Sequence, residues 1–277
     1  MSVELQTHPA KTVQLRTSII MPAYNEEGRI SARLQSLVSY FDEALGKAYE
    51  LLVVMDGCTD RTAQMVSQLA KDNCNIVAVS FPMRLGKGGA LIEAFKIAKG
   101  DILLLTDADD SIRPQELLRL AKEMENCDFV VGSRYAKGSR LLVREPFLRF
   151  FLGRAFNTIT KLLFWRMRGI NDTQCGCKAI KKSVVEKIRN DLFITGFAID
   201  VNLIYSAMRC GFKVKEVGVA WMHVEKGSKV SGALMKLVLG MFFSLVKLRL
   251  YYSRLRCTLS TMPMKALSSF LWNLTKA

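Results

Sequence analysis

The chain lacks features that mark several common classes of protein. Its first nine residues, Met1 to Pro9, include no apolar signal region, which predicts a protein that is not secreted. Seven cysteines are present without metal-like pairing, because Cys175 and Cys177 lie closer together than the cysteines of a C-x₂-C element. A cytosolic chain should keep such cysteines as reduced thiols. These absences predict a cytosolic protein without a cysteine-based metal site.

The chain also has few long apolar runs. Its second half has few acidic residues. Neither of two apolar segments, residues 147–165 and 234–252, offers the uninterrupted stretch of about 20 apolar residues that spans a bilayer. Residues 1–133 carry 14 Lys/Arg and 18 Asp/Glu, a net charge of −4, whereas residues 134–277 carry 26 and 7, a net charge of +19. A basic half suggests a polyanionic partner, either nucleic acid or anionic lipid.

The first apolar segment favours lipid over nucleic acid. Residues 147–165 are far too apolar for a solvated nucleic-acid face. Arg154, Lys161 and Arg168 recur every seven residues and predict one basic stripe on an otherwise apolar helix. Basic amphipathic helices of this kind lie in the interface of an anionic membrane. We therefore expect an interfacial helix at about residues 145–168.

The second apolar segment repeats the pattern. Residues 234–252 predict a helix on which Lys236, Lys247 and Arg254 lie near one line. The alternative is that both helices pack on a sheet or at a dimer interface, because core helices are also amphipathic. An anionic membrane surface is the expected partner, a homo-oligomer stays open, and nucleic acid is not expected.

Short apolar runs alternate with helical periodicity along the first half of the chain. Runs of strand length begin at Thr17, Tyr49, Asn75, Gly100 and Asp128. The first three are followed by helical patterns at residues 30–41, 63–70 and 91–98. Strands that alternate with helices indicate βαβ units and a largely parallel sheet. The chain is therefore expected to adopt an α/β fold.

The stretch Thr106-Asp107-Ala108-Asp109-Asp110 follows one of these strands directly. Open α/β sheets bind ligands just beyond the carboxyl ends of their strands. Two carboxylates there can share one hard cation, since magnesium takes one or two protein carboxylates together with water and phosphate oxygens. The alternative is a strand-ending turn, in which Asp is common. Because the motif stands among other polar strand ends, it predicts a site for a metal-bound diphosphate.

A glycine-rich segment, Arg84-Leu-Gly-Lys-Gly-Gly, follows another strand. Its two cations could contact a diphosphate near the start of a helix. It could equally be a glycine-rich helix entry. It is not a P-loop, because the spacing differs and no Lys-Ser/Thr pair follows.

Five short motifs follow one another along the chain. They are Pro22-Ala-Tyr-Asn-Glu, Asp56-Gly-Cys-Thr-Asp, Gly86-Lys-Gly-Gly-Ala, Asp107-Ala-Asp and Gly132-Ser-Arg-Tyr. In this order the chain resembles an inverting family 2 glycosyltransferase with a GT-A-type nucleotide-sugar fold. Asp172-Thr-Gln-Cys-Gly-Cys-Lys, Phe197-Ala-Ile-Asp and Gly227-Ser-Lys narrow the resemblance to the dolichyl-phosphate β-glucosyltransferases, with the dolichyl-phosphate mannosyltransferases as close relatives. The resemblance covers roughly residues 16–230.

The resemblance implies roles for residues in these motifs. Nucleotide-sugar binding is implied for Pro22, Tyr24, Glu26, Val54, Asp56, Lys87, Asp107, Ala108 and Arg134. Acceptor or phosphate binding is implied for Asp172, Gln174, Lys226, Ser228 and Lys229. Asp109, the likelier direct ligand, and Asp107 would hold Mg²⁺ or Mn²⁺, and Asp200 matches the family's base-position carboxylate. For the first motif, a helix start with Asn25 as N-cap is an alternative.

The sequence departs from the family pattern at three positions. Met55 and Cys58 stand where Asp-Asp-Gly-Ser is usual, so recognition of the base is expected to differ in detail. Ser111 stands where relatives often carry glutamine two residues after the second aspartate. Serine is a poorer metal ligand, which leaves that coordination position to water.

The expected function is transfer of a hexose, with UDP-glucose favoured as donor, onto a dolichyl or polyprenyl phosphate at the cytosolic face of a membrane. The alternatives are a GDP-mannose-dependent mannosyltransferase and, from another class, a sugar-phosphate nucleotidyltransferase. The latter class usually carries its glycine-rich loop at the first strand end, where this chain has Pro22-Ala-Tyr-Asn-Glu. The expected organisation is an N-terminal extension (1–15), a GT-A domain (16–230), and a C-terminal amphipathic helix and tail (231–277).

Overall fold

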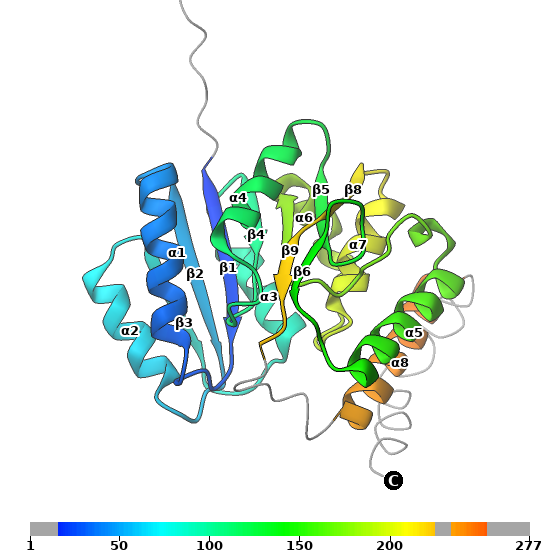
Figure 1. The fold of residues 1–277 in the computed structure, drawn as a ribbon, viewed down its shortest axis with the longest axis horizontal. Helices are drawn as coiled ribbons and strands as arrows, with labels where there is room; N and C mark the ends of the chain where they lie inside the picture. Colours follow the sequence, from blue (N-terminus) through cyan, green and yellow to red (C-terminus); the bar gives the residue numbers. More distant parts are fainter. Residues whose placement is uncertain (1–15, 225–233, 254–277) are drawn as a thin grey trace, which may run out of the picture.

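A seven-stranded sheet forms the centre of the molecule (Figure 1). The computed structural model describes residues 16–224 and 234–253. In it the strands lie in the order β3-β2-β1-β4-β7-β5-β8. Their bounds are β1 Thr17–Ala23, β2 Tyr49–Asp56, β3 Ile76–Phe81, β4 Ile102–Leu105, β5 Phe129–Ser133, β7 Lys178–Lys181 and β8 Val214–Gly218. All neighbouring strands are parallel except β7, which is antiparallel to β4 and β5, so the mostly parallel sheet predicted from the sequence is confirmed.

The sheet is buried on both faces. Successive residues of β1 and β2 point to opposite sides, so that Ile19 and Leu51 enter one apolar core while Ile20 and Leu52 enter the other. This explains why the strands appear in the sequence as continuous apolar runs rather than as alternating ones.

Helices cover the two faces of this sheet. α1 (Ile30–Leu45), α2 (Thr62–Asp72) and α4 (Pro114–Lys122) enclose one core, whereas α3 (Lys87–Ile97), α6 (Lys182–Ile188) and α7 (Ile199–Arg209) enclose the other. The helical patterns predicted after the first three strands correspond to α1, α2 and α3. In α1 the buried residues Ile30, Leu34, Leu37 and Phe41 form one stripe at helical spacing. Short 3₁₀ turns lie at Glu123–Glu125, Trp165–Met167 and Arg189–Asp191.

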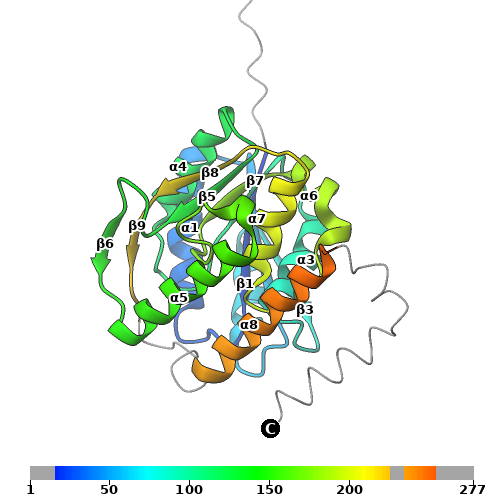
Figure 2. The same cartoon turned by 90° about the vertical axis from the view of Figure 1, so that its right-hand side faces the viewer.

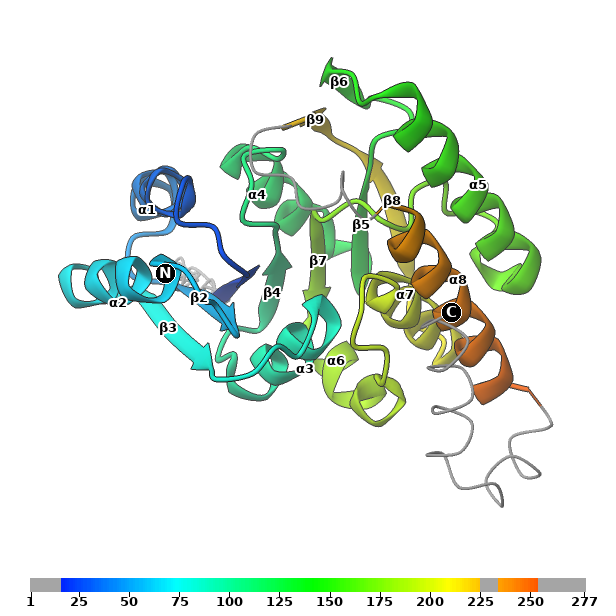
Figure 3. The ribbon, with the colours of Figure 1, turned by 90° about the horizontal axis from the view of Figure 1, so that it is seen from below.

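Two further helices lie side by side beyond one end of the sheet (Figure 2). They are α5 (Phe147–Leu163) and α8 (Leu234–Tyr251). Met241, Leu245 and Leu248 of α8 are buried in the same core as Phe156 of α5. Figure 3 shows this pair from below, next to α7. Both helices therefore pack on the α/β body along one side and keep another side exposed.

The basic stripe expected on α5 is not a surface stripe. Lys161 Nζ donates to Asn171 Oδ1 at 2.9 Å, and Arg154 packs over the ring of Tyr135 and donates to the carbonyl oxygen of Asn171. Arg168 lies beyond the end of the helix, over the ring of Trp165. The heptad spacing did put Arg154 and Lys161 on one face, but that face turns towards a loop with oxygen acceptors.

The exposed side of α5 is apolar instead. Phe147 and Leu162 are 80% and 75% exposed, and Leu148, Phe151 and Trp165 are also exposed. Among the described residues, no helix is long and apolar enough to cross a membrane.

A two-stranded ribbon lies beside the loop that contains the aspartates. β6 (Arg140–Val143) pairs with β9 (Ala220–Met222), and Trp221 also bridges to Ile112 at the end of the aspartate-rich loop. Met222 N–H donates to the carbonyl oxygen of Ser111 at 3.0 Å. This ribbon carries His223 to the edge of the loop that holds Asp107 and Asp109.

Candidate active site

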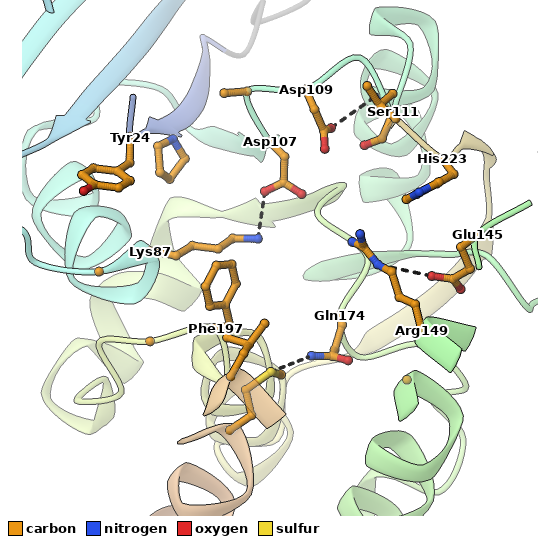
Figure 4. Close-up of a pocket in the computed structure, with 18 of the residues that line it drawn as sticks. Tyr24, Lys87, Asp107, Asp109, Ser111, Glu145, Arg149, Gln174, Phe197 and His223 are labelled. Atoms are coloured by element: carbon orange, nitrogen blue, oxygen red, sulfur yellow. Dashed lines mark hydrogen bonds and ion pairs between the residues drawn. The ribbon is translucent and has the colours of Figure 1, made fainter. Parts of the chain in front are cut away.

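One cavity of about 490 Å³ lies beyond the carboxyl ends of β1, β2 and β4 (Figure 4). One part of its lining is charged and the other part is apolar. The charged part comprises Glu26, Arg29, Asp56, Arg84, Lys87, Asp107, Asp109, Arg134, Glu145 and Arg149. The apolar part comes from α5, α8 and the segment before α7, and comprises Leu152, Phe156, Phe197, Leu237, Val238 and Met241. The cavity thus joins a polar site at the sheet edge to an apolar lining contributed by α5, α8 and the segment before α7.

A buried arginine holds the loop that carries the two aspartates. Arg33 of α1 donates to Thr106 Oγ1 and to the carbonyl oxygen of Ile112, each at 2.9 Å. These two acceptors lie at the start and the end of the loop. Because Arg33 is almost fully buried, it is a structural clamp rather than a ligand-binding residue. The sequence offered no signal for it beyond one charge within an apolar helical face.

Asp107 is held on both of its oxygens. Lys87 Nζ lies 2.8 Å from Oδ1, and Oδ2 packs so closely against Gly176 that a Cβ there would lie 1.9 Å from it. Burial favours the neutral acid, but Lys87 outweighs it and lowers the pKa of Asp107. Gly176 is therefore needed for close approach, which explains the glycine between Cys175 and Cys177.

Asp109 is the more available of the two carboxylates. Its Oδ1 accepts the N–H of Ser111 at 3.1 Å, and its carboxylate faces the cavity (Figure 4). The described residues contain no cluster of three or more His, Cys, Asp or Glu side chains suited to a metal. The described residues therefore offer a magnesium-like ion two carboxylates, Asp107 and Asp109, a donor set that magnesium accepts when substrate phosphates and water complete its shell. The residues present fit such an ion, with Asp109 as first ligand.

Backbone hydrogen bonds hold the glycine-rich segment in place. Both oxygens of Asp56 accept backbone N–H groups, from Leu85 and from Gly86, whose φ is +83°. The N–H groups of Gly88 and Gly89 donate to the carbonyl oxygen of Thr195 at 2.7 and 3.1 Å. The start of α3 therefore does not present these groups to an anion. Any contact with a diphosphate falls to side chains of this segment, above all Lys87.

The first strand end supplies an aromatic surface. The guanidinium of Arg84 lies 3.9 Å from the centre of the Tyr24 ring, and Pro22 and Ala108 line the same side of the cavity. Asn25 is not the N-cap of α1, because the helix begins at Ile30 and Asn25 has a φ of +52°.

Opposite this surface, two arginines meet one glutamate. Arg134 donates from Nε and Nη2 to both oxygens of the buried Asp172, at 2.8 and 3.0 Å. Its Nη1 lies 3.6 Å from Glu145 Oε2, and Arg149 Nε lies 3.5 Å from the same oxygen. Figure 4 shows the Arg149 guanidinium pointing into the cavity on the side of Asp107 and Asp109. Arg134 and Arg149 thus belong to the same cavity lining as the apolar residues of α5 and α8.

The predicted residues divide into those the cavity brings together and those it does not. Pro22, Tyr24, Glu26, Asp56, Lys87, Asp107, Ala108, Asp109, Arg134 and Gln174 line it. Val54 is buried in the apolar core instead, because its side chain points into the α3 face of the sheet. Asp172 and Asp200 are buried behind the lining, each in ion pairs. Lys226, Ser228 and Lys229 lie outside the described residues.

Sequence reasoning missed several cavity residues that come from the second half of the chain. Glu145, Arg149 and His223 line the cavity, as do the apolar residues of α5 and α8. A usable signal did exist, since Arg149 is a charged residue in the first turn of an apolar helix. The roles predicted for the individual site residues stay predictions.

Comparisons with known proteins agree with this geometry. Residues 18–189 match the family described as glycosyl transferase family 2. A dolichyl-phosphate beta-glucosyltransferase of Trichomonas vaginalis is 30% identical over 260 residues, which cover 88% of this chain and 77% of that protein. The chain belongs to glycosyl transferase family 2. The family resemblance inferred from the ordered motifs is thereby confirmed.

Other relatives of this family 2 glycosyltransferase extend the picture. The dolichyl-phosphate beta-glucosyltransferase of Saccharomyces cerevisiae is 27% identical over 235 residues, covering 78% of this chain and 70% of that protein. Among solved structures, glucosyl-3-phosphoglycerate synthase from Mycobacterium tuberculosis, in complex with Mn²⁺, UDP and phosphoglyceric acid, superposes with a TM-score of 0.63 at 20% identity. That match covers 88% of this chain and 84% of the other, and it shows that the two share a fold.

Proposed function

We propose that this family 2 glycosyltransferase transfers a hexose with inversion from a nucleoside diphosphate sugar, UDP-glucose being the favoured donor, to a dolichyl-type polyprenyl phosphate. The observation that carries the proposal is the two-part cavity, in which a charged site at the sheet edge continues into an apolar lining contributed by α5 and α8. A soluble acceptor would need no such apolar lining. A polyprenyl phosphate needs both parts, one for its phosphate and one for its chain. The names of the relatives support the same acceptor.

The donor fits the charged part. Tyr24 and Arg84 offer a stacked surface for the base, and the carboxylates of Asp109 and Asp107 would hold a divalent ion. The ammonium of Lys87 lies 2.8 Å from Asp107 Oδ1 and would contact a diphosphate oxygen. When bound, Mg²⁺ or Mn²⁺ would neutralise the charge that builds on the leaving diphosphate.

The acceptor fits the opposite side. Arg149 and Arg134 would bind the phosphate, and Leu152, Phe156 and Met241 would contact the first part of the lipid chain. One phosphate oxygen would attack the anomeric carbon in line with the leaving diphosphate. The bond from that carbon to the phosphate oxygen forms as the bond to the diphosphate oxygen breaks. The attacking oxygen is already anionic, so this transfer has no proton to remove.

The same arrangement suggests how the enzyme meets its acceptor. The exposed apolar side chains of α5, among them Phe147, Leu148 and Phe151, adjoin the cavity residues Leu152 and Phe156 on the same helix. We propose that this side lies against the cytosolic face of a membrane, with the apolar residues inserted and the basic half of the chain attracted by anionic lipid.

A triple variant in which serine replaces Phe147, Phe151 and Trp165 is expected to bind anionic vesicles more than about tenfold more weakly. The reason is that each large apolar side chain withdrawn from water contributes about 1.5–3 kcal/mol. The control is the pair Met83→Ser and Ile97→Ser, which changes exposed apolar residues of other segments. Co-sedimentation with vesicles of graded anionic content checks the result. A wild-type protein that leaves every vesicle composition unbound contradicts the membrane part of the proposal.

A donor and acceptor panel tests the reaction itself. UDP- and GDP-linked glucose and mannose are offered with a short polyprenyl phosphate or with 3-phosphoglycerate, each with Mg²⁺ or Mn²⁺. We expect transfer from UDP-glucose to the lipid phosphate only. Transfer from GDP-mannose would favour the mannosyltransferase, transfer to 3-phosphoglycerate would remove the lipid acceptor, and release of pyrophosphate from a nucleoside triphosphate and a sugar phosphate would favour a nucleotidyltransferase.

A further inference from the structure

Four charged side chains of alternating sign run from the cavity into the core. Lys87 Nζ lies 2.8 Å from Asp107 Oδ1 and 3.8 Å from Asp200 Oδ2, and Lys178 Nζ lies 2.9 Å from Asp200 Oδ1. The four residues come from the loop after β4 and from α3, α7 and β7. This row of four charged side chains therefore links the parts of the fold that surround the donor site.

The two ends of this row differ. Asp107 and Lys87 line the cavity, whereas the side chain of Lys178 is fully buried and donates to the carbonyl oxygen of Cys175. Asp200 is also buried, and each of its oxygens faces a different ammonium. Buried ionic side chains are found in pairs, and Asp200 and Lys178 hold each other in position.

This geometry does not suit a general base. A base must reach the proton that it removes, directly or through one water. Asp200 is not part of the cavity lining, and Lys87 stands between it and Asp107. A phosphate acceptor moreover brings an oxygen that is already ionised. The position of Asp200 suits the control of Lys87 better than the control of the acceptor.

Lys87 benefits from a second anchor. A lysine side chain has many rotamers, so one contact at Asp107 leaves it a choice of positions. Asp200 Oδ2, 3.8 Å from Nζ, offers a second contact. With both carboxylates present, the ammonium stays at the wall of the cavity.

We propose that Asp200, backed by Lys178, is a positioning residue that holds the Lys87 ammonium beside Asp107, where it contacts the diphosphate of the donor. This assignment rests on the proposed function, because it takes the donor to be a nucleoside diphosphate sugar. It replaces the role of base that the family pattern implied for Asp200.

The test is a double-mutant cycle on nucleotide binding. UDP affinity in the presence of Mn²⁺ is measured by calorimetry for the full chain and for Lys87→Met, Asp200→Asn and the double variant. Hydrogen bonds to charged groups are worth about 1.5–3 kcal/mol, so Lys87→Met should weaken UDP binding by about tenfold or more. Asp200→Asn should weaken it by a similar factor in the wild-type background and should add nothing in the Lys87→Met background.

Two further variants separate positioning from folding. Asp128→Asn removes a carboxylate from another lysine pair, Asp128 with Lys181 at 2.9 Å, and should leave UDP affinity unchanged. Asp200→Glu keeps the charge and should restore UDP affinity to within about threefold of wild type, as expected for a residue that acts by charge. It also serves as the test if Asp200→Asn does not fold, which a melting curve shows.

Three outcomes would overturn the proposal. If Asp200→Asn lowers the rate of transfer strongly and leaves UDP affinity unchanged, Asp200 acts as the base. Equal losses caused by Asp200→Asn with and without Lys87 show that Asp200 acts through the fold rather than through Lys87. A wild-type protein that binds neither UDP nor GDP removes the donor, and with it the proposed function as well as this assignment.

Discussion

Replacing Asp109 with alanine is expected to lower hexose transfer by about 1,000-fold or more without unfolding the protein. A bound divalent cation stabilises the leaving diphosphate by several kcal/mol, and each 1.36 kcal/mol is a factor of ten in rate. In the fold, the side chain of Asp109 accepts a hydrogen bond from Ser111 N–H, which is worth about 1 kcal/mol. Initial rates at saturating donor, together with a melting curve, check both parts of the expectation.

Asp110 provides the matched control for Asp109. It is a carboxylate of the same loop, but it does not line the cavity and instead pairs with Arg33 at 3.4 Å. Asp110→Ala should therefore keep most of the activity and most of the affinity for Mn²⁺ measured by electron paramagnetic resonance. Near-normal transfer by Asp109→Ala would remove the metal assignment, and loss of folding would favour a strand-ending turn.

Replacing Asp172 with alanine is expected to destabilise the protein by about 3–5 kcal/mol, because the buried guanidinium of Arg134 loses its bidentate partner and keeps only the longer contact with Glu145. Thermal or urea unfolding measures the effect. Lys215→Ala is the control, since Lys215 and Glu123 form an exposed pair that solvent screens, so its loss should change stability little. Similar losses for both variants would contradict the view that burial makes the Asp172 pair important.

The same pair predicts a dependence of stability on pH. Burial favours the neutral acid, but the guanidinium of Arg134 outweighs it and lowers the pKa of Asp172 below its ordinary 3.8. A carboxyl with a lowered pKa contributes stability above the unfolded value and loses it as pH falls through the folded value. The wild-type protein should therefore lose stability below pH 3.8 more steeply than Asp172→Asn. Parallel curves for the two proteins would contradict this.

The sheet could be predicted because its strands carry their own signal. Apolar runs such as Ile102–Leu105, each closed by a turn or by polar residues, identified the strands that precede the donor site. The antiparallel β7 was not predicted, because Lys178–Lys181 is short and contains two lysines. Its position between β4 and β5 depends on contacts made far away in the sequence, including that of Lys178 with Asp200.

The face that a helix presents to solvent could not be predicted in the same way. The spacing of Arg154 and Lys161 predicted a shared face but not what covers it, and Asn171, which covers it, lies beyond the helix. Asp200 shows the same limit, since its sequence neighbours do not reveal the two lysines that approach it. Local patterns predicted which residues belong to an element, whereas their partners came from distant parts of the chain.

The continuity of α5 and α8 from the cavity to the outer surface has a consequence for kinetics. On the proposed function, the acceptor would reach the cavity past these helices without leaving its bilayer, so the concentration that the enzyme meets would be a surface density. Adding inert lipid at constant total acceptor should then slow transfer by surface dilution, while adding more vesicles of the same composition should not. The part of the polyprenyl chain outside the cavity would stay among other lipids, so the rate of transfer should depend little on its length.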